Sequence, residues 1–134
     1  MREYVRAETA RLLDRFGAEL KRAARDADAD AIHDLRVSIR RLSRCLRVFA
    51  TFYPDGTWKK IRAELHGLLQ SAGAVRDRDI ALVLIGKAGV SPRTAIHRKL
   101  STERKAAERE MVAEIGRWSR RDPAAKWRRK LEID

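Results

Sequence analysis

The segment AIHDLRVSIRRLSRCLRVF, residues 31–49, carries the side chains with the clearest chemical potential in this chain. On an α-helix, which turns about 100° per residue, five of them fall within about 80° of arc and form a basic stripe about four turns long. Guanidinium groups in such a row can bind phosphate oxygens through paired hydrogen bonds. The spacing therefore predicts a track for an anion. The stripe consists of His33, Arg36, Arg40, Arg44 and Arg47.

The opposite side of the same helix is apolar, so one face is expected to build a core while the adjoining face holds positive charge. Two interpretations of the stripe stay open at this point. Its arginines could pair with acids on neighbouring helices or face water, or they could bind phosphate. Arginine outnumbers lysine 23 to 8 in the chain, which favours phosphate recognition. The apolar face consists of Ile32, Leu35, Ile39, Leu42, Leu46 and Phe49.

Two smaller basic arcs follow downstream. Lys59, Arg62 and His66 share one side of the next expected helix. Arg104 lies on a later helix in an arc with Arg93 and His97, into which Glu108 intrudes. Three stripes on adjacent helices could meet in one groove.

The elements that must position these residues are helices. Ala, Leu, Arg, Glu and Lys dominate the chain, and no alternating Val/Ile/Thr stretch predicts a strand. We expect an N-cap at Asp28 or Asp30, an interruption near Gly73 and new helix starts at Ser91-Pro92 and Asp122-Pro123. The predicted fold is all-α, an antiparallel four-helix bundle with a short C-terminal helix. The expected helices cover about residues 2–26, 31–52, 57–85 and 92–120, with a tail helix within 122–134.

Composition narrows the class of protein. The 134 residues suit one domain, 1–134, and carry a net charge of +12, which favours a polyanionic partner. Residues 1–30 are neutral, so the excess lies on the later helices. A single cysteine, Cys45, excludes a disulfide framework and a multi-thiolate metal site. No apolar run reaches the about 20 residues of a membrane span, and the N-terminal residues lack a secretory signal, so we expect a cytoplasmic protein without a membrane partner.

Two motifs resemble a known family. HDLRVSIRRLSR (residues 33–44) followed by AGAVRDRDI (residues 72–80) is similar to the CHAD family, the conserved histidine α-helical domain, with a motif-bearing core at 31–85. The resemblance implies a helical domain that binds inorganic polyphosphate, and family members include proteins fused to triphosphate-tunnel hydrolases or associated with polyphosphate granules. It makes His33, Arg36, Arg40, Arg41 and Arg44 the first signature, and Arg76, Asp77 and Asp79 the second.

This chain departs from the family pattern in length. Typical members contain two four-helix bundles around a central basic channel, whereas 134 residues suffice for one. We therefore expect a homodimer, because half a channel leaves apolar packing surface exposed. An open half-groove is the alternative.

The resulting hypothesis is non-catalytic polyphosphate binding through a basic helical surface, without a cofactor or a metal ion. The chain lacks a Gly-rich phosphate loop and clustered carboxylates, so we expect no enzyme activity. The rival hypothesis is a basic helical nucleic-acid-binding protein. Asp77 and Asp79 are expected to form an ion pair or to cap a helix beginning near residue 78, with a magnesium site as the weaker interpretation. The predicted binding residues are His33, Arg36, Arg40, Arg41, Arg44, Arg47, Lys59, Arg62, His66, Arg76 and Arg104.

Overall fold

The computed structural model describes residues 2–133, and these residues are helical apart from short links, with no strand among them. This confirms the all-α prediction. Met1 and Asp134, the two ends of the predicted domain, lie outside the described residues. The elements are α1 (Arg2–Arg25), α2 (Ala29–Val48), a 3-10 helix η1 (Ala50–Phe52), α3 (Thr57–Lys87), α4 (Ala95–Arg121) and α5 (Pro123–Lys130).

The start of α2 was predicted correctly, whereas the start of α4 was not. Asp28 is the N-cap of α2, as expected, and its Oδ1 accepts a hydrogen bond of 2.8 Å from the Ala31 amide. Helix α4 does not begin at Ser91-Pro92. The Ser91 hydroxyl instead accepts from the Arg93 amide within the turn, and Thr94 caps the helix by accepting from the His97 amide. The capping bond therefore moves the start to Ala95.

Helix α3 runs unbroken through Gly73, so the expected interruption does not occur. No helix begins near residue 78, and the predicted cap by Asp77 is therefore wrong. Asp122 is also no side-chain cap for α5, because its backbone is left-handed (φ 49°) and its carboxylate makes no capping bond. Pro123 does occupy the first turn of α5, as predicted.

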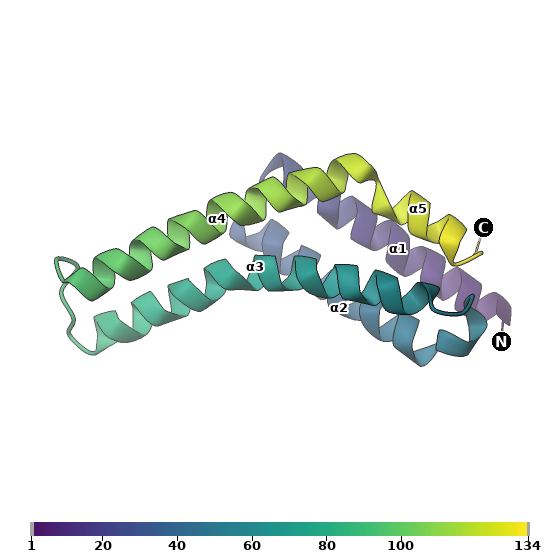
Figure 1. Ribbon diagram of the computed structural model, residues 1–134, viewed down its shortest axis with the longest axis horizontal. Helices are drawn as coiled ribbons and strands as arrows, with labels where there is room; N and C mark the ends of the chain where they lie inside the picture. The colour runs from purple at the N-terminus through teal and green to yellow at the C-terminus, as the bar shows by residue number, and fades with distance from the viewer. Residues whose placement is uncertain (1, 134) are drawn as a thin grey trace.

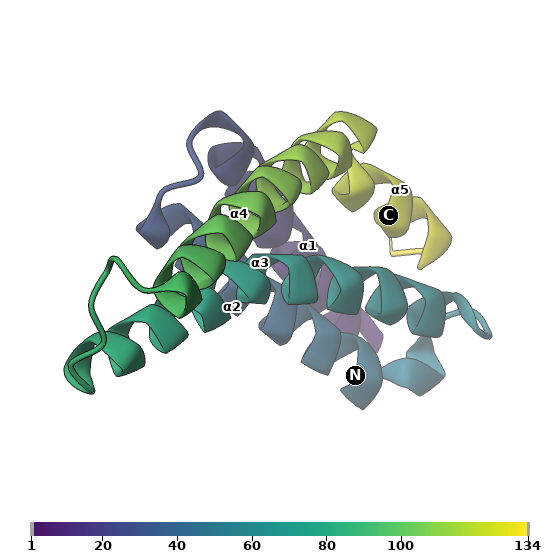
Figure 2. The same cartoon turned by 60° about the vertical axis from the view of Figure 1, so that its left-hand side comes forward.

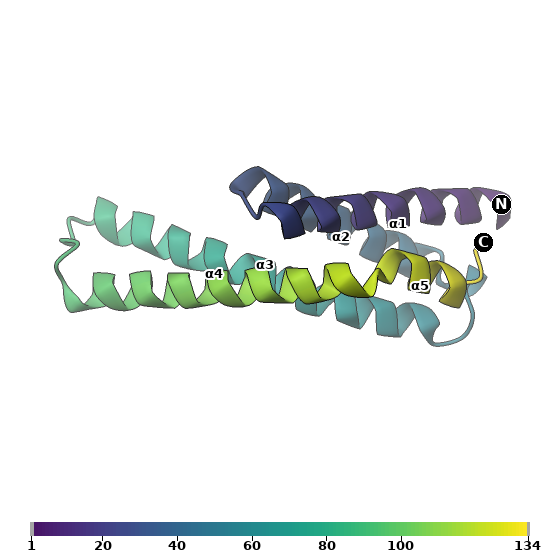
Figure 3. The ribbon, with the colours of Figure 1, turned by 90° about the horizontal axis from the view of Figure 1, so that it is seen from above.

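The helices form two hairpins, α1–α2 and α3–α4, that overlap over only part of their length (Figure 1). Seen from above, α3 and α4 continue side by side well past the corner that joins α1 to α2 (Figure 3). Figures 1 and 2 both place the α3–α4 loop at the far tip, away from α5 and the C-terminus. Short α5 returns along α1, where an added Cβ at Gly17 would lie 3.1 Å from the Ala124 Cβ.

The core lies where the two hairpins overlap, and every helix contributes to it. Phe16 of α1 stacks on Trp127 of α5 with ring centroids 5.5 Å apart. Leucine and isoleucine side chains spaced three and four residues apart supply most of the rest, as expected for amphipathic helices. The largest fully buried side chains are Leu13, Phe16, Leu20, Leu35, Ile39, Leu42, Leu46, Ile61, Leu65, Leu68, Ile115 and Leu131.

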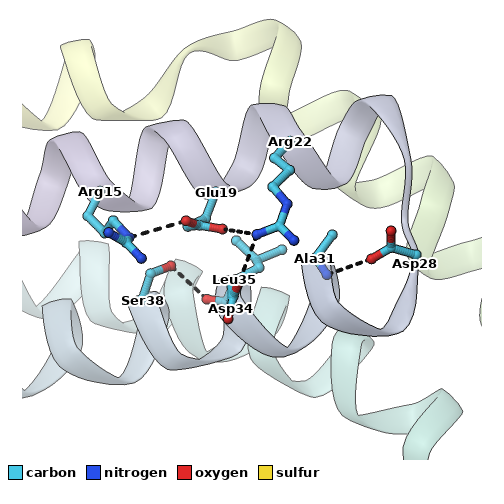
Figure 4. A network of polar contacts seen from close by, with 8 residues as sticks. All are labelled: Arg15, Glu19, Arg22, Asp28, Ala31, Asp34, Leu35 and Ser38. Atoms are coloured by element: carbon cyan, nitrogen blue, oxygen red, sulfur yellow. Dashed lines mark hydrogen bonds and ion pairs between the residues drawn. The ribbon is translucent and has the colours of Figure 1, made fainter.

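A polar network holds α1 against α2 (Figure 4). Buried Glu19 lies between Arg15 and Arg22, with nitrogen–oxygen distances of 3.2 and 3.4 Å. Arg22 also bonds Asp34 of α2 at 2.7 Å. The hydrogen bond that Arg22 donates to Asp34 raises the pKa of Arg22 above its ordinary value. These arginines are therefore compensated by acids, in keeping with the neutral balance of residues 1–30.

A second buried cluster anchors the link between α2 and α3. The Tyr53 and Thr9 hydroxyls lie 2.7 Å apart, and the Cys45 sulfur lies 3.6 Å from the Thr9 hydroxyl. Burial raises the pKa of the Tyr53 hydroxyl above its ordinary value. Cys45 itself is buried, so it serves packing. The cluster fixes the chain direction into α3, which carries half of the basic surface.

Candidate anion-binding surface

A groove of about 910 Å³ runs between α2 and α3 and is lined by two rows of basic side chains. Helix α2 contributes Arg40, Arg44 and Arg47 at spacings of four and three residues. Helix α3 contributes the facing row, so the two basic arcs meet on one surface. The α3 row consists of Lys59, Arg62 and His66.

No carboxylate lines this groove, and within residues 2–133 none of its arginines or its lysine forms an ion pair. The described ion pairs lie on α1, between α1 and its neighbours, or on the outer half of the α3–α4 hairpin. The interpretation in which the α2 stripe pairs with acids of neighbouring helices therefore does not hold for Arg40, Arg44 and Arg47.

Two contacts position the groove walls. The Arg62 Nε donates a hydrogen bond of 3.0 Å to the Ser43 hydroxyl, which joins α3 to α2 across the groove floor. The Lys59 Nζ lies 5.6 Å from the centroid of the Trp58 ring, within the range of a cation–π contact. Sequence reasoning missed both Ser43 and Trp58 as lining residues. Their positions beside Arg44 and Lys59 were the available signal.

Arg36 extends the α2 row of arginines beyond the groove. Its charge is unfavourable there, because the side chain is partly buried beside other arginines. Its Nε is buried without a hydrogen-bond partner, and its Nη2 would lie 3.9 Å from a Cβ added at Gly73 of α3. Burial lowers the pKa of Arg36 below its ordinary value, and the charges of Arg40 and Arg76 lower it further, while Asp77 acts in the opposite direction. A phosphate oxygen beside these guanidinium groups would relieve that repulsion.

A second hollow, of about 400 Å³, lies where the start of α2 meets α3 and α4. His33, Arg36 and Arg76 reach it, so it continues the basic row of α2. Arg104 also lines it, but this guanidinium is paired with Asp79 and, at 2.9 Å, with Glu108. The hydrogen bond to Asp79 raises the pKa of Arg104. Arg104 thus lies at the predicted site, but two carboxylates compensate its charge. Asp79 forms an ion pair across the α3–α4 hairpin.

Arg41 lies apart from the groove. It lines hollows on the α1 side of α2, beside Arg11 and Arg15 in one and beside Tyr4 and Glu8 in another. Arg44 reaches both sides, since it also lines the hollow that contains Tyr4. Exposed Asp77 is on α3 next to Arg76. Of the predicted binding residues, the α2–α3 surface and its extension gather His33, Arg36, Arg40, Arg44, Arg47, Lys59, Arg62, His66 and Arg76.

Fold and surface together define a class: an all-helical domain whose α2–α3 groove is lined by arginine and lysine side chains and by no carboxylate of the described residues. No group of three or more His, Cys, Asp or Glu side chains within residues 2–133 could hold a metal ion. None of the described helices combines the length and apolar character of a membrane crossing.

The family model of the CHAD domain matches residues 7–133, and the chain therefore belongs to the CHAD-domain family. CHAD domains have polyphosphate-related roles and are associated with triphosphate-tunnel proteins. Neither the curated proteins nor the solved structures include a match to this chain.

Proposed function

We propose that this protein binds inorganic polyphosphate along the α2–α3 groove and its extension at Arg36. The observation that carries the proposal is the facing pair of cationic rows without a carboxylate between them. From Arg36 to Arg47 the α2 row rises about 16 Å, enough to hold several consecutive phosphate units. Polyphosphate repeats the same charged unit along a flexible chain, so a repeated row of cations complements it.

The groove suits a phosphate chain better than a nucleic acid. Base-reading or base-stacking surfaces interleave aromatic rings with cations, whereas Trp58 is the only aromatic side chain that lines this groove among the described residues. Trp58 is moreover half-buried beside Lys59. The lining therefore supports recognition of phosphate oxygens without recognition of bases.

The proposed activity is binding without cleavage. Phosphoanhydride hydrolysis needs a positioned water and charge stabilisation at the leaving oxygen, commonly by metal ions held by carboxylates. The groove lining supplies basic side chains that hold the chain but no carboxylate that could hold a metal ion there. A binding protein of this kind would reside in the cytoplasm, where it could associate with polyphosphate granules. We also propose that it self-associates, through the surface argued in the next subsection.

The decisive experiment compares ligands at one salt concentration. Fluorescence anisotropy with labelled long-chain polyphosphate, single-stranded DNA, duplex DNA and RNA should rank polyphosphate first at physiological salt. Equal or tighter binding of any nucleic acid would reject the assignment in favour of a nucleic-acid-binding protein. The same samples, incubated with magnesium and assayed for released phosphate, should show none. Release that depends on the groove arginines would instead establish an enzyme.

A further inference from the structure

The outer part of the α3–α4 hairpin contains apolar side chains that this chain does not bury. Within residues 76–110 no residue is buried, although the segment includes the run ALVLI at 81–85. Val83 and Leu84 are 56% and 60% exposed, and Ile80 is 46% exposed. The two hairpins overlap only up to the α1–α2 corner, so within residues 2–133 only α3 and α4 themselves pack along this segment (Figures 1 and 3). An apolar stripe of this kind marks an interaction surface.

The stripe continues the face of α3 that packs on α2. Gly73 approaches Arg36 of α2, and Ile80 follows it seven residues later on the same side of the helix. Arg76 shares a hollow with α2 residues, and Val83 lies seven residues beyond Arg76. Beyond the start of α2 this face simply has no helix against it. The shape therefore suits another helix laid along α3.

Charge is segregated along the same hairpin. From Ile80 to Thr102 the chain contains no acid and four bases, Lys87, Arg93, Arg98 and Lys99. The α1–α2 corner has the opposite character, since Asp26, Asp28 and Asp30 are exposed there. This corner borders the base of the hairpin, because Asp28 lines the same hollow as Asp79 of α3. The basic tip and the acidic α1–α2 corner thus lie on either side of the apolar stripe.

We propose that the covering partner is a second copy of this chain, packed antiparallel along the outer hairpin in a symmetric dimer. A two-fold axis through the stripe lays the apolar stripe of one protomer on the same stripe of the other, with Ile80 opposite Leu84 and Val83 near the axis. The same axis brings each basic tip to the acidic corner of the other protomer. An anionic membrane fits less well, because the acidic corner beside the stripe would repel it. The inference does not rest on polyphosphate binding, which uses the α2–α3 groove; only the extension of that groove at Arg36 and Arg76 borders the proposed interface.

The first test introduces charge at the centre of the proposed interface. The wild-type protein is expected to sediment as a dimer that dissociates on dilution in analytical ultracentrifugation. V83E should raise the dimer dissociation constant by about a hundredfold, because it buries two unpaired carboxylates at the two-fold axis. V112E is the matched control, since Val112 is a comparably exposed valine (47%) on the part of α4 that packs on the core, and it should leave the dimer intact.

A charge swap tests the orientation. The double substitution K87E/K99E should weaken the dimer about tenfold or more, and adding D26K/D30K to it should restore most of the affinity. Asp28 is left unchanged in this design because it caps α2. Circular dichroism should show unchanged helicity throughout, since all four positions are exposed.

A wild-type protein that remains monomeric at every concentration overturns the proposal. So does a dimer that V83E leaves unchanged, or a swap that restores nothing. Vesicles containing phosphatidylglycerol give the competing outcome: flotation of a monomeric wild type that V83E abolishes would assign the stripe to a lipid surface. Polyphosphate titrations of V83E report the groove separately, so loss of the dimer with retained ligand affinity distinguishes this inference from the proposed function.

Discussion

The arginines of α1 and those of α2 differ in their neighbours more than in their number. On α1, Arg11 pairs with Glu8, while Arg22 pairs with Glu19 and with Asp34 of α2. On α2, Arg40 and Arg44 face a groove lined by Lys59, Arg62 and His66 and by no carboxylate. The paired arginines of α1 contribute to helix packing. The unpaired arginines of α2 keep their hydrogen-bonding capacity for a ligand. Net charge alone does not distinguish these two kinds of surface.

The largest expected effect is the salt dependence of polyphosphate affinity, which should differ between the α2–α3 groove and the ion pairs of α1. If the five arginine and lysine side chains of the groove displace counterions from polyphosphate, affinity should fall by about 100- to 500-fold between 50 and 200 mM salt. Helix–helix packing through α1 should respond much less, because its network includes the buried carboxylate of Glu19. Anisotropy titrations and thermal unfolding over the same salt series measure the two responses. A shallow dependence of binding on salt would argue against the groove as a polyanion track.

Charge reversal in the groove should lower polyphosphate affinity, whereas the same reversal on α1 should not. R40E/R44E places two carboxylates in the groove, and polyphosphate affinity should fall by about a hundredfold at moderate salt. The control R6E/K21E makes the same change in net charge on exposed positions of α1, and it should change affinity by less than about threefold. If both variants lose affinity equally, binding follows net charge and not the groove.

Substitution of Arg36 should change stability and polyphosphate affinity in opposite directions. In R36M the buried unpaired Nε and the repulsion from Arg40 and Arg76 are removed, so the free energy of unfolding should rise by about 1 kcal/mol. Polyphosphate affinity should fall by about tenfold, because one guanidinium of the row is lost. The equivalent change on α1, R22M, should lower stability since it removes the contacts with Glu19 and Asp34. Urea denaturation and anisotropy measure both quantities, and a destabilised R36M would show that the Arg36 charge is not unfavourable.

The smallest expected effect concerns the groove floor. S43A removes the acceptor for the Arg62 Nε, which frees that guanidinium to move. Polyphosphate affinity should change by about twofold to threefold, since the charge remains while its position is less defined. R62K should have a larger effect than S43A, because lysine lacks the planar fork that binds two phosphate oxygens. Isothermal titration of both variants would show whether orientation contributes beyond charge, and equal affinities would indicate that it does not.

Helix periodicity was sufficient to predict the all-α fold and the basic face of α2. The positions of Arg40, Arg44 and Arg47 relative to Leu42 and Leu46 depend only on the rotation per residue, which every α-helix shares. The cap at Asp28 was predictable for the same reason, because it depends on bonds within four residues of chain. The start of α4 was predicted at Ser91-Pro92, but the Ser91 hydroxyl bonds within the turn and Thr94, three residues later, caps the helix.

The sequence by itself determined that the chain is helical and which face of α2 is basic. Only the tertiary structure decided which cations stay unpaired. Arg104 and Arg62 look alike along the chain, yet Arg104 meets Asp79 across the hairpin while Arg62 meets Ser43 beside other cations. The tertiary structure also decided that α3 and α4 extend past α1 and α2 and leave Val83 exposed. The physical reason is that helix formation depends on neighbours within one turn, whereas charge pairing and burial depend on residues that only packing brings together.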